Sequence, residues 1–535
     1  RTPGHPEYGH TDGVETTTGP LGQGIATAIG MAIAERMAAA RFNVAGSEPV
    51  VDHRTWVFCG DGDLEEGISH EACSLAGHLK LDKFVLFYDS NGITIEGHTD
   101  LALSDDAKKR FQAYNWHVLE IDGHDFDQID RAIRKATKLT GKPVLIICKT
   151  HIGKGSPNKQ DSHEAHGAPL GEEEVKLTKT ALGFDPEKAF YVPQEVTTLF
   201  QERASKTKRM QGKWKRVFKE WAKANPGLAE TWKAMQEDLI PADIESALPA
   251  FDPAKPVATR SASGVVLNAL AKVLPQLVGG SADLAPSNKT FVKGFTESGR
   301  GRTGRNMHFG IREHAMGAIQ NGIAYYGGFL PYSATFFVFM DYMRPAVRLA
   351  ALSGLHTVYV FTHDSFHVGE DGPTHQPVEH LAAARAIPNL TVIRPADAEE
   401  TREAWLAALA NTSGPTALLL TRQNLPVIDR SAGCDASALS RGAYVIGDPA
   451  KSAEVLIMAS GSEVSLAVDA AAALAGRGIA ARVVSFPSWE LFEKQSPEYR
   501  ESVLPPSLAT RVVIEAGIAM GWERYAGSSA LFITL

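Results

Sequence analysis

Short apolar runs alternate with helical patterns along most of this chain, and this alternation is the feature that most limits its fold. The pattern of residues 23 to 42 is helical, because Ile25, Ile29, Ile33 and Met37 recur every four positions on one face. Strands that alternate with helices form parallel sheets covered by helices. The pattern therefore predicts an α/β fold. The runs typical of strands are TWVFC, KFVLFYD, PVLIICK, HTVYVFTHD, TALLLTR and AEVLIMAS.

Length and composition set the number of domains and exclude some partners. A chain of 535 residues exceeds what one hydrophobic core supports, which predicts about three or four domains. The net charge of -8, from 54 basic and 62 acidic residues, gives no electrostatic reason to expect nucleic acid or an anionic membrane as a partner. No apolar run reaches the roughly 18 residues that a membrane helix requires. We therefore expect a soluble multidomain protein.

The domain boundaries follow from a basic helix and a proline-rich stretch. Residues 205 to 224 place an apolar stripe, which includes Trp214 and Trp221, among many lysines and arginines. A nucleic-acid or membrane helix fits this pattern, but the negative overall charge and the helical spacing of the aromatics favour a connecting helix with a solvated basic face. Four prolines between positions 241 and 256 then indicate a linker. The predicted division is 1–225, a linker over 226–255, 256–435, and 436–535.

Cysteine usage and the chain ends give two further expectations. Cys59, Cys73, Cys148 and Cys434 are scattered, and two of them lie inside strand-like runs, which predicts reduced thiols in a cytoplasmic protein. The sequence begins at Arg1 and stops inside an apolar run, so we interpret it as a fragment that lacks both ends. A targeting peptide would then lie outside the sequence.

The stretch VFCGDGDLEEG contains the first candidate site. Its apolar run stops at Gly60-Asp61-Gly62, and Asn91 follows the next predicted strand 30 positions after Asp61. Neighbouring parallel strands bring their carboxyl ends to the same edge of a sheet, so Asp61 and Asn91 can converge. A carboxylate, an amide oxygen and a loop carbonyl are ligands that suit Mg²⁺ when a phosphate and water complete its shell. The pair predicts a metal–phosphate site, whereas a GDG turn alone would be a weak signal.

This pair resembles the thiamine diphosphate signature, and the remaining motifs narrow the resemblance to the transketolase family. The matching segments occur in the family's order and cover essentially the whole sequence. They are TPGHPE, GVETTTGPLGQG, EGISHE, GSPNK with HGAPLG, GGSADLAPSN, FGIREHAMG, HDSFHVGEDGPTHQP and TRQNL. The family implies three α/β domains, namely two thiamine diphosphate-binding folds and a C-terminal α/β domain.

The resemblance also implies which residues bind the cofactor. Asp61, Asn91 and the main-chain carbonyl of Ile93 would hold Mg²⁺ or Ca²⁺ on the diphosphate. Gly62 and the loop formed by Gly19, Pro20 and Leu21 would line the cofactor, with Leu21 supporting its bent form.

In the second domain, Glu313 would share a proton with the ring nitrogen N1′ of the aminopyrimidine, a task that requires a partly desolvated carboxyl with a raised pKa. Phe339, with Phe336 and Tyr342 nearby, would stack on that ring. Without the resemblance, this aromatic cluster would be predicted as core and Glu313 as a surface residue.

The histidines allow two interpretations. His363, His367 and His375 lie beside acidic residues and could suggest zinc, but their spacings of 4 and 8 match no standard zinc pattern. The family instead implies that His375, His5 and His166 act in proton transfer and in binding sugar hydroxyls, with His166 also near the diphosphate. His163 would be only a structural neighbour, and we assign no role to His367, His151 or Lys154.

A sugar phosphate also needs a cationic end to its pocket. Arg260, Arg422, Ser287 and His363 occupy the family's phosphate-binding positions, and guanidinium groups match the geometry of a phosphate. Asp371 and Asp283 would bind sugar hydroxyls.

The implied activity is transfer of a two-carbon ketol unit from a ketose phosphate such as xylulose 5-phosphate to an aldose phosphate such as ribose 5-phosphate. The family architecture implies a homodimer with active sites at the subunit interface. The alternatives are dihydroxyacetone synthase, phosphoketolase, deoxyxylulose phosphate synthase, a non-catalytic homologue that binds the cofactor, and a zinc hydrolase.

Overall fold

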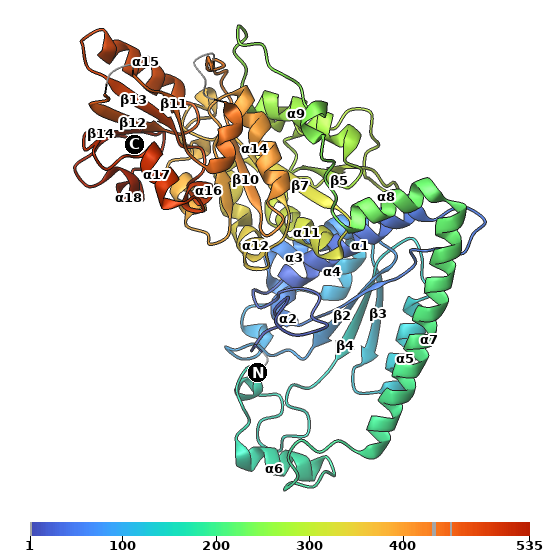
Figure 1. Cartoon of the computed structure of the whole chain (residues 1–535). Coiled ribbons are helices and arrows are strands. Elements are labelled where there is room, and N and C mark those ends of the chain that lie inside the picture. The colour runs from blue at the N-terminus through green and yellow to red at the C-terminus, as the bar shows by residue number, and fades with distance from the viewer. Residues whose placement is uncertain (1–2, 431–434, 450–451) are drawn as a thin grey trace. The chain divides into compact units, whose positions relative to one another are not determined.

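The structure is a computed structural model that describes residues 3–430, 435–449 and 452–535. It divides into two compact units, each of which we describe by itself. The first comprises Thr18–Lys233 with Arg300–Thr303, and the second comprises the described residues of Arg1–Thr17, Ala234–Gly299 and Gly304–Leu535. Figure 1 gives the labels of the helices and strands. None of the helices in the described residues is long and apolar enough to cross a bilayer.

The first unit is built on a parallel sheet in the order β1-β2-β4-β3. The helix α5 packs on one face of this sheet, against Val85, Phe87 and Ile146. On the other face Phe84 contacts Trp116, which in turn contacts Phe111 of α4. The strands are β1 (Thr55–Cys59), β2 (Phe84–Ser90), β3 (His117–Asp122) and β4 (Val144–Lys149), and the helices are α1 (Gln23–Phe42), α2 (Asp61–Glu65), α3 (Gly67–Leu79), α4 (Ala107–Ala113), α5 (Phe126–Ala136), α6 (Glu172–Ala181) and α7 (Gln194–Ala224).

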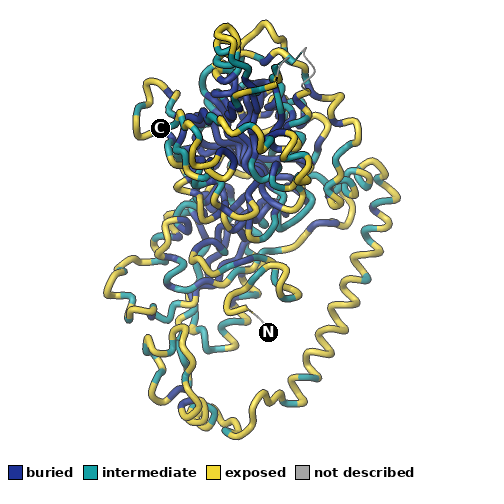
Figure 2. Tube along the Cα trace, turned by 60° about the vertical axis from the view of Figure 1, so that its left-hand side comes forward, coloured by how far each residue is buried: buried dark blue, intermediate teal, exposed yellow. Residues whose placement is uncertain are grey.

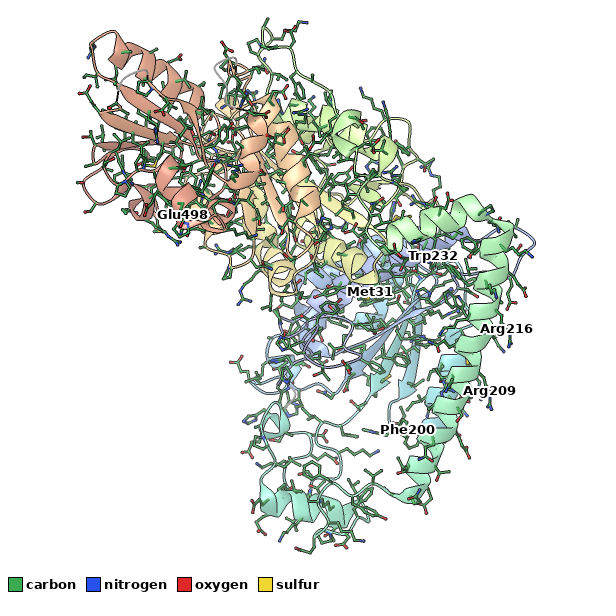
Figure 3. All side chains as sticks on the ribbon, viewed as in Figure 1. Met31, Phe200, Arg209, Arg216, Trp232 and Glu498 are labelled. Carbon is green, nitrogen blue, oxygen red and sulfur yellow. The ribbon has the colours of Figure 1, made fainter. Side chains whose placement is uncertain are left out.

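The predicted basic helix is the C-terminal part of α7, and it behaves as a connecting helix with a solvated face. Trp221 is buried and donates a hydrogen bond to the carbonyl of Phe42, while Trp214 donates to that of Val50. The rest of the helix is largely exposed (Figure 2), and Arg209 and Arg216 project from it into solvent (Figure 3). Only the last turns of α7 therefore contribute to a core.

The second unit contains two α/β layers. The first is a parallel sheet in the order β6-β5-β7-β8-β10-β9. Its strands are β5 (Leu277–Ser281), β6 (Asn306–His308), β7 (Leu330–Phe336), β8 (Val358–Thr362), β9 (Thr391–Ile393) and β10 (Thr416–Leu420), and its helices are α9 (Thr259–Val273), α10 (Ala285–Asn288), α11 (Glu313–Tyr326), α12 (Met340–Leu352), α13 (His380–Arg385) and α14 (Ala398–Ala410).

The second layer of this unit has the strand order β11-β13-β12-β14-β15, parallel except where β11 pairs with β13. We call it the C-terminal layer. One hydrophobic core joins both layers, since Trp405 of α14 and Ile457 of β12 belong to the same cluster of buried side chains. Its elements are β11 (Tyr444–Gly447), β12 (Val455–Ala459), β13 (Ala481–Ser485), β14 (Arg511–Ile514), β15 (Leu531–Ile533), α15 (Glu463–Ala475), α16 (Trp489–Glu493), α17 (Pro497–Val503) and α18 (Glu523–Ala526).

These observations confirm the predicted fold class, three layers of mainly parallel sheet covered by helices. The predicted helix over residues 23–42 is α1, and all six apolar runs contain strands. Much of the predicted linker is ordered, because α8 spans Pro226–Gln236 and Ile244 and Leu248 are buried. The boundaries at 225, 255 and 435 stay predictions. Cys59, Cys73 and Cys148 are free thiols, and Cys434 lies outside the described residues.

Candidate active site

Asp61 and the loop after β2 lie together at the carboxyl edge of the first sheet. β1 and β2 are adjacent and parallel, with Cys59 opposite Tyr88, so the residues that follow both strands meet at one edge. Asp61 is 5% exposed, and its carboxylate accepts hydrogen bonds from the Tyr88 hydroxyl at 2.5 Å and the Gly92 amide at 2.9 Å. Burial and Asp61 raise the pKa of Tyr88, so its hydroxyl stays protonated and donates. The strand order thus produces the convergence that the sequence predicts.

The turn from Asn91 to Ile93 supplies further oxygen atoms beside Asp61. The side-chain oxygen of Asn91 accepts a hydrogen bond from the Ile93 amide at 2.9 Å, and Gly92 has a φ of 72° that favours glycine. A carboxylate, an amide oxygen and a main-chain carbonyl form a set of hard oxygen donors that suits Mg²⁺ or Ca²⁺. These residues fit the metal that a bound diphosphate requires.

Leu21 and Gly62 form a close contact beside this edge. A Cβ added to Gly62 would lie 2.9 Å from Leu21 Cδ1, so only glycine leaves room there for both the loop and a ligand. The same two residues line a pocket of about 400 Å³ together with Glu66, Thr94 and His98. Leu21 is half-exposed and therefore available to a ligand.

Asp63 fixes the loop that carries Gly19, Pro20 and Leu21, a role that sequence analysis missed. Its carboxylate accepts hydrogen bonds from the amides of Gly22 and Gly60, both at 2.9 Å. One side chain thus connects the end of β1 to a loop 41 residues earlier. The run of acids after Gly60 was the available signal, but nothing in it distinguishes Asp63 from its neighbours.

Two predicted histidines, His166 and His5, are exposed. His166 follows the short 3₁₀ turn His163–Ala165 and is exposed, as is His163. His5 is exposed in the N-terminal stretch, where Tyr8 packs against Tyr325 of α11 with ring centroids 4.8 Å apart. Within the described part of the first unit, no hydrogen bond or ring contact joins His166 to Asp61 or Asn91.

In the second unit, four rings gather where β7 ends. Phe336 and Phe339 are parallel with centroids 5.9 Å apart, and Tyr342 lies 5.8 Å from Phe339. His375 approaches Phe339 edge-on at 5.3 Å from the loop before α13. The prediction that these aromatics belong to one cluster is correct, and Tyr342 remains exposed at its edge.

Glu313 begins α11 and is buried close to this cluster's strand. Glu313 is 8% exposed, and among the described residues the side-chain donor to its carboxylate is the Thr335 hydroxyl of β7, at 3.5 Å. Burial raises the pKa of the Glu313 carboxyl and the nearby Asp283 carboxylate adds to the rise, while hydrogen bonds from the Glu313 amide and Thr335 oppose it. A carboxyl in this environment keeps its proton to a higher pH than an exposed glutamate does.

His363 is the residue that follows β8, and both its backbone and its ring are constrained. Its φ of 60° lies in the left-handed region, and its ring stacks on Phe336 with centroids 3.7 Å apart. Burial lowers the pKa of His363 to about 3, and Arg260, Arg422 and His375 contribute. The imidazole is therefore neutral at physiological pH and serves as a hydrogen-bonding group.

Arg260 and Arg422 form a cationic end beside His363. Arg260 donates to the Ser287 carbonyl at 2.9 Å, and Arg422 pairs with the exposed Glu370 at 2.5 Å. Burial lowers the pKa of Arg260, the positive charge of Arg422 lowers it further, and Asp371 opposes the shift. Two guanidinium groups that repel each other and lie beside a neutral histidine form a set of charges and donors that suits a phosphate dianion.

The histidine loop does not form a zinc site. In the part of the chain that the structure describes, one group of three His, Cys, Asp or Glu side chains brings its ligand atoms within 4.8 Å of one another, and it consists of Asp341, Glu379 and His380. His363 is instead packed against Phe336, and His367 packs against Phe366 at 4.0 Å.

Comparisons with known proteins agree with this geometry. The family model "Transketolase, thiamine diphosphate binding domain" matches residues 1–241, "Transketolase, pyrimidine binding domain" matches 255–427, and "Transketolase-like TK C-terminal domain" matches 442–535. The chain is 52% identical over 530 residues to a transketolase of Halalkalibacterium halodurans, covering 99% of this chain and 79% of the relative. It is 51% identical over 535 residues to one of Geobacillus stearothermophilus, with coverages of 99% and 80%.

Solved structures give the same result. Transketolase from Leishmania mexicana has a TM-score of 0.95 and 44% identity, covering 100% of this chain and 78% of that one. A Pichia stipitis transketolase in complex with sedoheptulose 7-phosphate has a TM-score of 0.95 and 43% identity, with coverages of 100% and 79%. The chain is therefore a thiamine diphosphate-dependent transferase. It belongs to the transketolase family, whose members move two-carbon ketol units between sugar phosphates.

Proposed function

We propose that Glu313 is the residue on which the chemistry of this transketolase depends, and that Asp61, Asn91 and the Ile93 carbonyl hold Mg²⁺, or Ca²⁺, on the cofactor's diphosphate. The observation that carries the proposal is the environment of Glu313, a buried carboxyl with a raised pKa at the start of α11. When bound, thiamine diphosphate supplies a nucleophilic carbon and an electron sink for carbon–carbon cleavage.

The protein's own part is orientation and proton transfer. Glu313 holds a proton at N1′ of the aminopyrimidine, and the rings of Phe336, Phe339 and Tyr342 position that heterocycle by stacking. Leu21 and Gly62, with Gly19 and Pro20, shape the pocket for the bent cofactor. His375, His5 and His166 exchange protons with the sugar and bind its hydroxyls, as do Asp283 and Asp371.

Xylulose 5-phosphate is the proposed donor and ribose 5-phosphate the proposed acceptor, within the pentose phosphate pathway. Support comes from Pichia stipitis transketolases, whose solved complexes hold xylulose 5-phosphate and sedoheptulose 7-phosphate. Arg260, Arg422, Ser287 and His363 bind the substrate phosphate. A cytoplasmic location is in keeping with the free thiols of Cys59, Cys73 and Cys148.

The test is two-carbon transfer by the full-length protein with and without thiamine diphosphate and Mg²⁺. Glu313→Gln should lower kcat by about 10³-fold, since general acid–base groups contribute about 10² to 10⁴, with little change in cofactor affinity. Glu403→Gln is the matched control, because Glu403 is also 8% exposed and burial also raises its pKa. Equal losses in both variants would contradict a catalytic role for Glu313.

We also propose a homodimer in which each active site combines Asp61 of one subunit with Glu313 of the other. Mixing inactive Asp61→Asn and Glu313→Gln proteins under conditions of subunit exchange tests this. A site shared between subunits leaves one intact site in each mixed dimer, so about a quarter of wild-type activity should return if exchange is random. A site within one subunit would give no recovery.

A further inference from the structure

Arg394 lies at the end of β9 and is one of the most deeply buried charges in the second unit. Its side chain is 1% exposed, and its Nε donates to Asp364 Oδ2 at 2.8 Å. Asp364 is also 1% exposed and immediately follows His363 in the chain. An arginine from one strand end thus holds the residue next to the proposed phosphate-binding histidine.

The remaining groups of Arg394 contact the C-terminal layer. Its Nη1 donates to the Ser460 carbonyl at 2.9 Å and to the carboxylate of Glu463, and its Nη2 donates to the Ser462 hydroxyl at 3.2 Å. Its main chain is held as well, since its amide donates to Pro487 and its carbonyl accepts from Gly461. One residue therefore connects the first layer's strand ends to the turn over Ser460–Ser462.

Gly461 is fitted against this arginine. It has a φ of 57°, and a Cβ added there would lie 2.7 Å from both Cζ and Nε of Arg394. The turn over Ser460–Ser462 therefore packs directly against the guanidinium group that binds Asp364.

Glu515 of the C-terminal layer closes the network from the other side. It pairs with Arg385 at 2.7 Å and lies 3.7 Å from Arg394 Nη1, and it also accepts a hydrogen bond from the Trp522 indole at 2.5 Å. Each charged group in this network is at most 9% exposed. A buried ion pair adds little net stability compared with apolar packing. We therefore ask which geometry this network of charges fixes.

We infer that Arg394 is a positioning residue through which the C-terminal layer fixes the His363 turn for recognition of the substrate phosphate. His363 needs such support, because it occupies the left-handed region that non-glycine residues rarely adopt. Arg394 anchors the next residue, so a shift of its guanidinium group moves His363 away from Arg260 and Arg422. The inference rests on the proposed function, in which His363 binds the phosphate.

The test is a pair of glycine substitutions in the C-terminal layer of the full-length protein. Gly461→Ala places a methyl group against Arg394, whereas Gly478→Ala is the matched control, since Gly478 has a φ of 82° and nothing within 4 Å of an added Cβ. Both variants carry the same kind of backbone strain, but only the first displaces Arg394. Arg394→Lys is a second variant that keeps the charge and loses the fork of donors.

Two substrate pairs distinguish a misplaced phosphate site from a general loss of activity. With xylulose 5-phosphate and ribose 5-phosphate, Gly461→Ala and Arg394→Lys should lower kcat/KM about tenfold, mainly through KM, as expected when a binding group is misplaced. With the unphosphorylated pair erythrulose and glycolaldehyde, the same variants should stay within about twofold of wild type, because no phosphate contact is used. Gly478→Ala should match wild type with both pairs.

Equal losses with both substrate pairs, or no loss with either, would overturn the inference. The equilibrium affinities for ribose 5-phosphate and for ribose can be compared without turnover. Gly461→Ala should reduce the preference for the phosphorylated sugar. If the wild type transfers no two-carbon unit, the proposed function fails, and this comparison of affinities still decides whether Arg394 positions a phosphate site.

Discussion

Two buried carboxylates in this molecule have similar exposure and opposite surroundings. Asp61, 5% exposed, accepts hydrogen bonds from Tyr88 and Gly92 at 2.5 and 2.9 Å, whereas Glu313, 8% exposed, accepts from its own amide and, at a longer 3.5 Å, from Thr335. Donors that point at a carboxylate favour its ionised form, and burial without them favours the protonated form. Depth alone therefore does not decide what a buried acid does, and the difference in donors supports the proposed roles of Asp61 in cation binding and of Glu313 in proton transfer.

The largest effect should come from removing the charge of Asp61. We expect Asp61→Asn to weaken binding of thiamine diphosphate in the presence of Mg²⁺ by about 10²-fold or more, since losing even outer-shell partners of a metal costs about 10- to 100-fold. Calorimetric titration measures this. EDTA treatment of the wild type should produce a similar loss that Mg²⁺ reverses, and Mg²⁺ should not rescue the variant. Unchanged affinity in Asp61→Asn would remove Asp61 from the metal site.

A smaller effect should follow from removing one donor to Asp61. Tyr88→Phe deletes the 2.5 Å hydrogen bond and should weaken Mg²⁺-dependent cofactor binding by about tenfold. Tyr332→Phe is the control, because that buried hydroxyl donates to the Thr290 carbonyl at 2.9 Å and belongs to another sheet. If both variants bind the cofactor equally well, Tyr88 has no part in preparing Asp61.

The corresponding change beside Glu313 removes the side-chain donor to that carboxylate and should favour its protonated form. Thr335→Val removes a hydrogen bond that favours the ionised carboxylate, so the pKa of Glu313 should rise further. The limb of the pH–rate profile on which Glu313 ionises should therefore move to higher pH, with kcat at neutral pH changed by less than about threefold for so long a contact. A shift to lower pH would contradict the assigned environment.

The smallest effect concerns stability. Because its folded pKa is raised, Glu313 takes up a proton on folding in the window between its ordinary value of 4.5 and the raised value. The free energy of unfolding of the wild type should therefore fall relative to Glu313→Gln as pH rises through that window. Asp125→Asn provides the opposite sign, since hydrogen bonds from Gln128 and Asp127 lower the pKa of Asp125, whose contribution is lost as pH falls below 3.8. Thermal unfolding at several pH values measures both.

The sequence was sufficient where local patterns decide the outcome. The strands and α1 follow from periodicity, and the approach of Asp61 to the loop after Asn91 follows from adjacent parallel strands. Glu313 was identified only through family resemblance, because its burial depends on β7 and not on its own helix. The roles of Asp63 and Arg394 could not be predicted, since each contacts a main-chain group far along the chain, the Gly22 amide 41 residues from Asp63 and the Ser460 carbonyl 66 residues from Arg394, and such groups carry no sequence signal.

The exposure of α7 has a consequence for local unfolding of this protein. Its 31 residues are held mainly near Trp214 and Trp221, and in the stretch before Met210 every residue except Thr197 is exposed. A helical segment without tertiary contacts is only marginally stable in water, so these turns should open and close without disturbing either sheet. Their amides should exchange with deuterium long before those of α1, and trypsin should first cleave after Arg203, Lys206 or Lys208.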